Sequence, residues 1–366
     1  MNSKNSINSK NSINSIVVRG TNWVGDSIMS IPALRELSRV FPDAEIVLHT
    51  RKWAEGIFRD ADFLDRIITF EPAKWKVRDA ITQSDILRKQ AFDLAILLPN
   101  SFESALTARL AGIPRRIGYN KDLRGLLLTD PIAVPEWKTK RHEVHYFLNL
   151  IAEAEKRFAG TSTVPCSEPD STLEISDERK TEARRILMAH GVDLTKKVVA
   201  LGTGSTNSRA KRWGVGAYAE LNDLLRNELG ANVILVGSAD ESNIAAEVTK
   251  LSKSPPIDMT GKTDLAEAAA ILSVIDLLVS NDMGLAHIAP AVGTKTAVIF
   301  GPTNPVTTSP FSPNAVVVRH DVECSPCMLR DCPIDHRCMT RISVNEVFNI
   351  CRDLLTPAEE ANEFTN

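Results

Sequence analysis

The chain has 366 residues, of which 43% are hydrophobic and 24% are charged, as in an ordinary globular protein. Its formal net charge of -3 argues against a nucleic-acid-binding protein that depends on bulk positive charge. No stretch reaches the ~18 consecutive apolar residues of a membrane-spanning helix, and the N-terminus lacks the apolar core of a signal peptide. We therefore expect a cytoplasmic protein of two domains whose 6 cysteines are not paired in disulfides.

The charge is distributed unevenly along the chain. Residues 16–165 carry 22 basic against 19 acidic residues, whereas residues 166–366 carry 19 basic against 27 acidic residues. Any anionic partner is therefore expected to bind the first half. Residues 1–15 form a repeat of Asn, Ser, Lys and Ile that cannot bury enough apolar surface to order itself, so we predict a disordered tail there.

Short apolar runs alternate with helical patterns in the first half of the chain. Strands are predicted at residues 16–19, 45–49, 66–70 and 93–98, and helices at residues 30–40 and 77–90. The run at 94–98 is apolar throughout, as in a strand that is covered on both faces. This alternation predicts βαβ units and a parallel sheet.

A stretch of small, polar and proline residues at 159–172 predicts an interdomain linker. Beyond a helix at 176–190, a second series predicts strands at 197–202, 232–237, 277–280 and 296–300, and helices at 215–229, 242–251, 264–273 and 284–291. We therefore predict an α/β fold of two tandem Rossmann-like domains, 16–165 and 166–366. The last helix is a candidate to pack back on the first domain. Ligands of such sheets bind at the carboxyl ends of the strands.

The first candidate site follows the first predicted strand and has the sequence RGTNWVGDS at residues 19–27. Gly20 and Gly25 permit tight turns, and Asp26 falls where a helix would begin. Two interpretations stay open, because Asp is a favoured N-cap and a carboxylate in a cleft can also act as a general base. The dinucleotide-binding fingerprint G-x-G-x-x-G is absent.

The second candidate site is the segment GTGSTNSRAKRW at residues 202–213. Glycines and small hydroxylated residues expose backbone N–H groups that suit a phosphate, and Lys211 and Arg212 add positive charge. The alternative is a solvated, flexible loop. The segment is not a Walker A motif, because the G-K-[ST] ending is missing.

The third candidate site, VSNDMGLAH at residues 279–287, again runs from a strand into a helix. Asn281 or Asp282 can cap this helix, and its free N–H groups and dipole favour an anion. His287 faces either the ligand or the core. A similar small-residue turn, FGPT at 300–303, closes the next strand.

Four cysteines lie within fifteen residues, at Cys324, Cys327, Cys332 and Cys338, and are called here the four-cysteine segment. Such thiolates can bind zinc or iron, and His336 could replace one of them. A reduced loop, or a disulfide that forms only on oxidation, is the alternative.

A basic stretch at residues 115–141 holds seven basic and three acidic residues. Runs of charge are usually solvated faces. The functional alternative is a cradle for an anionic acceptor.

Taken together, these motifs resemble the heptosyltransferases of glycosyltransferase family 9. The residues that carry the resemblance are WVGD at 23–26, LPNSF at 98–102, AGIP at 111–114, KRW at 211–213, VGS at 236–238, SNDMGLAH at 280–287 and GPT at 301–303. They occur in order between about residues 16 and 355. The first two motifs are closer to the heptosyltransferase II branch than to the heptosyltransferase I branch.

The resemblance implies a GT-B fold, in which two Rossmann-like domains face a central cleft, and an inverting transfer of L-glycero-D-manno-heptose from ADP-heptose to a heptose of the lipopolysaccharide inner core. It implies catalytic roles for Asp26 as the base and Lys211 at the diphosphate. The implied donor contacts are Thr203, Ser205, Lys211, Ser238, Asp282, Met283, Gly284, Leu285 and His287. The implied acceptor contacts are Asn22, Trp23, Asn100, Ser101, Arg115 and Arg116.

The resemblance also implies catalysis without a cofactor, no nucleic-acid partner, and contact with the inner face of the inner membrane only through the lipid-linked acceptor. One departure concerns Glu103, which stands where many relatives have Lys. The alternatives are a related glycosyltransferase that acts on another core sugar or a protein side chain, and a non-catalytic nucleotide-sugar-binding protein. A nicotinamide-dependent epimerase is disfavoured by the missing G-x-G-x-x-G.

Overall fold

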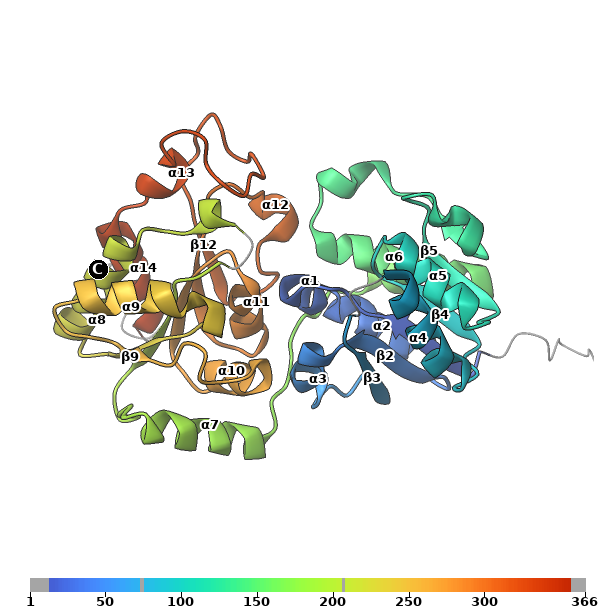
Figure 1. Cartoon of the computed structure of the whole chain (residues 1–366), viewed down its shortest axis with the longest axis horizontal. Helices are drawn as coiled ribbons and strands as arrows, with labels where there is room; N and C mark the ends of the chain where they lie inside the picture. Colours follow the sequence, from blue (N-terminus) through green and yellow to red (C-terminus); the bar gives the residue numbers. More distant parts are fainter. Residues whose placement is uncertain (1–12, 73–75, 206–207, 357–366) are drawn as a thin grey trace, which may run out of the picture. The chain divides into compact units, whose positions relative to one another are not determined.

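The computed structural model describes residues 13–72, 76–205 and 208–356, and its described residues form two compact units (Figure 1). Unit 1 contains the chain up to Asn22 together with Ser30–Glu55 and Ala61–Asp170. Unit 2 contains Trp23–Met29, Gly56–Asp60 and the chain from Ser171. Most of the predicted tail lies outside the described residues, and Ser15, its last residue, already belongs to a strand.

Unit 1 is built on a parallel sheet of six strands in the order β3-β2-β1-β4-β5-β6. Val17 at its centre pairs with Val47 on one side and Ala95 on the other. This strand order is the Rossmann order. The strands are β1 (Ser15–Arg19), β2 (Glu45–Arg51), β3 (Arg66–Phe70), β4 (Leu94–Leu97), β5 (Arg115–Tyr119) and β6 (Asp130–Ile132).

Helices cover the sheet of unit 1 in two contacting pairs, α2 with α6 and α4 with α5. The apolar residues of α4 and α5 pack on Val17, Val47 and Ala95 of the sheet. The α-helices are α2 (Ile31–Val40), α3 (Lys52–Phe58), whose last turn belongs to unit 2, α4 (Lys76–Arg88), α5 (Phe102–Leu110) and α6 (Glu143–Ala159). The 3-10 helices are η1 (Arg124–Leu127), η2 (Glu136–Thr139) and η3 (Val164–Cys166).

Unit 2 repeats the same architecture, with the strand order β12-β11-β10-β7-β8-β9, which is the Rossmann order read from the opposite edge. Its strands are β7 (Val198–Gly202), β8 (Asn232–Leu235), β9 (Ile257–Asp258), β10 (Leu277–Asn281), β11 (Lys295–Ile299) and β12 (Ala315–Val318). Its helices are α1 (Val24–Met29), α7 (Asp177–Ala189), η4 (Arg209–Lys211), α8 (Val215–Leu229), η5 (Ala239–Glu241), α9 (Ser242–Leu251), α10 (Leu265–Leu272), α11 (Gly284–Ala291), α12 (Pro305–Thr308), α13 (Arg337–Thr340) and α14 (Val344–Leu355).

The α/β class and both parallel sheets confirm the prediction, and all eight predicted strands are present. The prediction gave no range for four short strands, β5, β6, β9 and β12, or for helices α3, α5, α6, α12, α13 and α14. Helix α14, the last helix, packs on α8, β10 and β11 of its own unit. Among the described residues, no helix has both the length and the apolar character that crossing a bilayer requires.

Candidate active site

Both sheets reverse their strand order at one point, between β1 and β4 in unit 1 and between β7 and β10 in unit 2. Ligands of open parallel sheets bind at the carboxyl ends of the strands beside this point. The predicted site motifs follow these four strands, at residues 20–26, 98–101, 203–205 and 282–287. The structure therefore places most of the predicted site residues where this fold binds ligands.

Asn281, the last residue of β10, organises the loops at the carboxyl edge of the second sheet. Its side-chain carbonyl accepts the backbone N–H of Trp213 at 2.9 Å, and its amide donates to the carbonyls of Thr203 at 3.0 Å and Gly204 at 3.1 Å. Because these bonds use the whole amide group, Asn281 does not cap the following helix, as the sequence had suggested. It ties the loop after β7 to the segment that carries Lys211.

Lys211 forms an ion pair at this edge of the sheet. Its ammonium lies 2.7 Å from Oδ2 of Asp282 and 3.3 Å from the carbonyl oxygen of Asp282. The hydroxyl of Thr303 donates to the same carboxylate at 2.7 Å. The Asp282 side chain is 6% exposed and that of Lys211 is 26% exposed, so the ammonium keeps an open side for a ligand. Asp282 therefore orients the lysine and is not a cap either.

The N-terminus of α11 carries no side-chain cap. Its N-cap residue is Met283, which forms no capping hydrogen bond, and the first helical residues are Gly284 and Leu285. Backbone N–H groups in the first turn of a helix have no partner within the helix and favour an anion. The predicted donor residues Thr203 and Ser205 are buried in the neighbouring loop, and Ser205 accepts a hydrogen bond from Arg212 through its carbonyl at 2.9 Å.

Helix α1, which carries Asp26, packs directly on α11 within unit 2. A Cβ atom on Gly25 would lie 2.9 Å from Cδ2 of His287, and one on Gly284 would lie 2.8 Å from Cβ of Val24. A larger residue at either position would displace its neighbour, since these contacts are closer than side chains normally approach. Asp26 lies half-buried in the first turn of α1, and thus on the same compact unit as Lys211 and α11.

Glu241 is a candidate site residue that the sequence analysis missed. Its side chain is buried, with Oε2 accepting the backbone N–H of Ser238 at 2.8 Å, while Oε1 has no hydrogen-bond partner among the described residues. A Cβ atom on Gly204 would lie only 1.9 Å from Oε1, so the loop after β7 runs directly over this carboxylate. A ligand hydroxyl would reach this oxygen only if the loop moved aside. The spacing of Ser238 and Glu241 is a capping-box signal that could have drawn attention to it.

In unit 1, Asn100 and Ser101 follow β4 as predicted. The Asn100 amide donates to the hydroxyl of Tyr146 at 3.1 Å, and its carbonyl accepts from the buried guanidinium of Arg124 at 3.4 Å. Ser101 caps α5 by accepting the N–H of Ser104 at 3.3 Å, which gives it a structural role. Of the remaining predicted acceptor residues in the loop after β1, Asn22 is exposed in unit 1 and Trp23, 58% exposed, begins unit 2.

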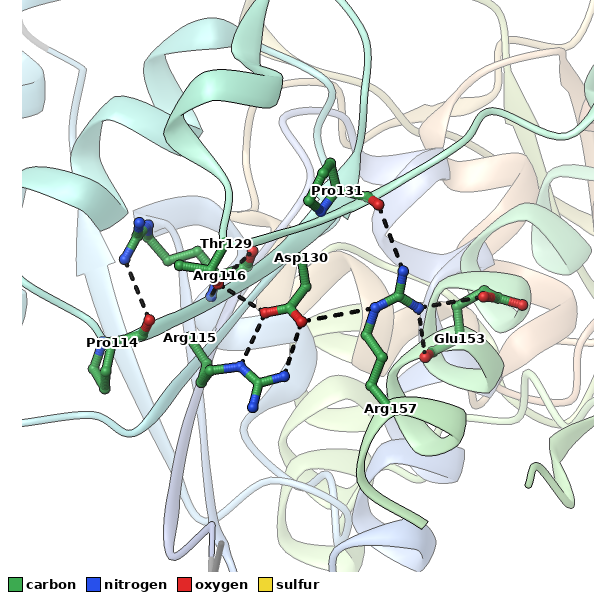
Figure 2. Close-up of polar contacts among 8 residues, drawn as sticks. All are labelled: Pro114, Arg115, Arg116, Thr129, Asp130, Pro131, Glu153 and Arg157. Carbon is green, nitrogen blue, oxygen red and sulfur yellow. Dashed lines mark hydrogen bonds and ion pairs between the residues drawn. The ribbon is translucent and has the colours of Figure 1, made fainter. Parts of the chain in front are cut away.

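Arg115 and Arg116 lie apart from the other predicted acceptor residues of unit 1. They begin β5 and thus lie at the amino edge of the sheet, opposite the loops that follow β1 and β4. Figure 2 shows that Arg115 donates both arms of its guanidinium to Asp130, at 2.9 and 2.8 Å, and that Arg157 approaches the same carboxylate at 3.8 Å. Arg116 donates to the carbonyl of Leu127 at 2.8 Å. The basic stretch is here an internal network of ion pairs and hydrogen bonds.

All four thiols of the four-cysteine segment line one cavity of about 70 Å³. Burial, followed by the charges of the other three thiols, raises the pKa of Cys338. Nevertheless, among the described residues no three His, Cys, Asp or Glu side chains lie close enough together to hold a metal ion. His336 is engaged elsewhere, because its Nε2 lies 2.6 Å from the carbonyl of Ala210. The metal hypothesis therefore stays a prediction.

The two Rossmann-like units, with a lysine and an uncapped helix N-terminus at the switch point of the second sheet, define a GT-B glycosyltransferase. Residues 82–337 match the family model for glycosyltransferase family 9 (heptosyltransferase), and the chain belongs to this family.

Relatives span nearly the whole chain. The lipopolysaccharide heptosyltransferase 2 of Salmonella typhimurium is 29% identical over 312 residues, which cover 83% of this chain and 87% of the relative. The lipooligosaccharide heptosyltransferase 2 of Campylobacter jejuni is 24% identical and covers 93% of this chain and 99% of the relative. The solved structure of the Escherichia coli ADP-heptose lipopolysaccharide heptosyltransferase II matches with a TM-score of 0.79 at 25% identity, covering 93% of this chain and 98% of that one. A family 9 glycosyltransferase of Veillonella parvula matches with a TM-score of 0.81 at 21% identity and supports the fold.

Proposed function

We propose that this enzyme transfers L-glycero-D-manno-heptose from ADP-heptose to a heptose of the lipopolysaccharide inner core, with inversion at the anomeric carbon. The relatives named heptosyltransferase 2 support heptose as the transferred sugar and the lipopolysaccharide core as the acceptor. The observation that carries the proposal for the reaction is the packing of α1 on α11, which holds Asp26 on the unit that carries Lys211.

In the proposed reaction, Asp26 takes the proton from the acceptor hydroxyl while that oxygen forms a bond to the anomeric carbon of the donor. The bond from the anomeric carbon to the β-phosphate oxygen breaks in the same step, and ADP leaves with the electron pair. A positioned general base of this kind typically contributes ~10²–10⁴-fold to the rate. Attack from the face opposite the leaving ADP inverts the anomeric configuration.

Negative charge grows on the β-phosphate as ADP departs, and two groups of unit 2 are suited to stabilise it. The Lys211 ammonium is already oriented by Asp282 and Thr303, so little reorganisation is required when the charge appears. The uncapped N–H groups at the start of α11 add a second source of positive potential. Asp282, being an anion itself, is assigned the role of holding Lys211 and not that of touching the diphosphate.

The test is turnover of the purified protein with ADP-heptose and an inner-core acceptor that already carries one heptose. ADP release and acceptor mass are followed together, and the anomeric configuration of the product is read by NMR. We expect a gain of one heptose with inversion. The Asp26→Asn variant should lose ~10²–10⁴-fold in kcat while its Kd for ADP stays the same, because the carboxylate acts on the acceptor and not on the nucleotide.

A matched control is Asp177→Asn, which removes a carboxylate that is fully exposed at the start of α7 in the same unit. Its turnover should equal that of the wild-type protein. Full activity of Asp26→Asn would remove Asp26 from the mechanism. Release of ADP without a mass gain in this acceptor would instead favour a different acceptor, such as another core sugar or a protein side chain.

A further inference from the structure

Two arginines share one aromatic ring at the carboxyl edge of the first sheet. Arg19 ends β1, Arg51 ends β2 and Phe70 ends β3, and these three strands are neighbours. The guanidinium carbon of Arg19 lies 4.3 Å from the centre of the Phe70 ring, and that of Arg51 lies 5.7 Å from it. Two positive charges therefore converge at the edge where the sheet is expected to bind its ligand.

Neither charge is neutralised within the described part of the chain. Arg19 is 6% exposed and donates only to neutral oxygens, the carbonyl of Gly20 at 2.6 Å and the side chain of Asn22 at 3.3 Å. Arg51 is half-buried, and its buried Nε has no hydrogen-bond partner. No ion pair of either residue is found among the described side chains.

Electrostatics confirm that the two guanidinium groups feel each other. The pKa of Arg19 is lowered to about 10, mainly by burial and in smaller part by the charge of Arg51, while the carboxylates of Glu103 and Asp79 act in the opposite direction. Those carboxylates are close enough to exert a field but do not pair with Arg19. Burying a charge without a partner costs free energy, and a second like charge adds to that cost. A bound anionic ligand would reduce both of these free-energy costs.

His49 lies in the same cluster and contributes no third charge. Its ring is 4.8 Å from that of Phe70, and both of its nitrogens are buried without a hydrogen-bond partner. Burial, followed by the charge of Arg19, lowers the pKa of His49 to about 3, so the imidazole is neutral at physiological pH. A neutral imidazole has one N–H to donate and does not increase the repulsion.

Arg115 on the same sheet shows the usual solution to a partly buried arginine. Asp130 neutralises it through two hydrogen bonds at the amino edge (Figure 2). At the carboxyl edge, no carboxylate of the described residues forms an ion pair with Arg51, and Glu71, the residue after β3, pairs with Lys52 at 3.8 Å. The difference between the two edges indicates that the charge at the carboxyl edge is kept for a ligand.

We propose that Arg51 binds an oxyanion of the acceptor, a phosphate or a carboxylate, at the carboxyl edge of the first sheet, and that Arg19 positions this site. The inference rests on the proposed function, because it names the acceptor group that unit 1 recognises. Arg51 donates directly to the anion, as guanidinium groups commonly do to phosphate and carboxylate. Arg19 adds its field and holds Asn22, the last residue of unit 1 before α1.

The experiment measures initial rates of ADP release by the full chain with three forms of the heptose-bearing acceptor. One form is intact, the second is treated with phosphatase, and the third has its carboxyl groups esterified, so that the two sources of the oxyanion are distinguished. The variants are Arg51→Gln and Arg51→Lys. Lys89→Gln is the matched control, because Lys89 is an exposed cation of unit 1 just beyond the end of α4.

We expect Arg51→Gln to raise the KM of the intact acceptor by about tenfold or more, the usual effect of losing a hydrogen bond to a charged group, with little change in kcat. Arg51→Lys should keep part of the affinity, and Lys89→Gln should behave as wild type. One of the two modified acceptors should raise the KM of the wild-type enzyme to the same extent, and Arg51→Gln should no longer respond to that modification. The proposal would be overturned if Arg51→Gln left the KM unchanged. It would also be overturned if modification of the acceptor raised the KM equally in Arg51→Gln and in the wild-type enzyme.

A direct titration with inorganic phosphate, followed through the arginine Nε–Hε signals in NMR spectra, separates this proposal from the proposed function. If no acceptor is turned over but phosphate shifts a signal that is lost in Arg51→Gln, the oxyanion site stands and the heptose transfer fails. If the acceptor is turned over, but phosphate shifts no Arg51 signal and the KM of the intact acceptor is the same for Arg51→Gln and the wild-type enzyme, the oxyanion site is refuted and the heptose transfer stands.

Discussion

Replacing Gly25 with alanine tests whether the packing of α1 on α11 positions the catalytic groups. The new Cβ would lie 2.9 Å from Cδ2 and 3.0 Å from Nε2 of His287, whereas carbon atoms in contact are normally ~3.5–4.0 Å apart. Helix α1 or the His287 ring must therefore move by roughly 0.5–1 Å. His287 is 5% exposed and has little free volume into which it could turn.

The displacement affects activity more than stability. Misplacing a reacting group by 1 Å can cost ~10²-fold in rate, so Gly25→Ala should lower kcat by about 10- to 100-fold. Overpacking costs ~1–3 kcal/mol, and the better helix propensity of alanine offsets about 1 kcal/mol of that cost. The free energy of unfolding should therefore fall by no more than about 2 kcal/mol, which leaves the protein folded.

The assay combines ADP release at saturating substrates with urea unfolding. Gly216→Ala is the matched control, because Gly216 lies exposed in α8 and a Cβ atom there would meet nothing within 4 Å. That variant should keep its kcat and gain up to about 1 kcal/mol of stability. Wild-type kcat in Gly25→Ala would refute the reasoning, since it would mean that the close approach of the two helices does not set the position of Asp26.

Three further predictions follow from other contacts. Lys211→Ala should weaken ADP binding and lower kcat by ~10²–10³-fold. Asp282→Asn should lower kcat less, because the lysine remains but is no longer held by the carboxylate. Wild-type kcat values in both variants would exclude this pair from the reaction. In the folded protein the pKa of His49 is lowered to about 3, whereas in the unfolded chain His49 titrates near 6.5. The unfolded state therefore takes up a proton first as the pH falls, and the free energy of unfolding should decrease by about 1.4 kcal/mol for each pH unit below 6.5. Urea unfolding at pH 7 and pH 5 should show a smaller decrease for His49→Met than for the wild-type protein, and an equal decrease in both would contradict the prediction. If the side chains of the four-cysteine segment rearrange to hold a metal, elemental analysis should find one zinc or iron per chain. Protein that contains neither metal after expression in metal-supplemented medium would contradict the metal hypothesis.

The strands that the sequence revealed are the buried ones. Strands β4 and β7 are apolar from end to end, and burial on both faces of a parallel sheet requires that pattern. Strand β5 was missed because it begins with Arg115 and Arg116, whose charges suggested a solvated segment. Tertiary contacts make an arginine acceptable there, above all the one with Asp130, fifteen residues further along the chain.

The sequence predicted where the loops of the candidate site lie better than it predicted which partners their side chains contact. The positions of the loops follow from strand order and from the glycines, which are local signals. The partners of Asn281 and Asp282 are residues up to 78 positions away along the chain, and no local pattern reports such contacts. Both Asn281 and Asp282 looked like helix caps in the sequence, yet each bonds to another loop.

The route of the chain through the two units bears on how this enzyme could be divided or recombined. The polypeptide enters unit 2 for α1, returns at Ser30, enters again for Gly56–Asp60 and finally stays from Ser171 onward. A donor-binding fragment cut at Ser171 would lack α1 and would leave the surface of α11 around Gly284 bare. Exchange of unit 1 between relatives would therefore have to keep residues 23–29 and 56–60 with the C-terminal half, so that a functional chimera needs four junctions before the one near Ser171.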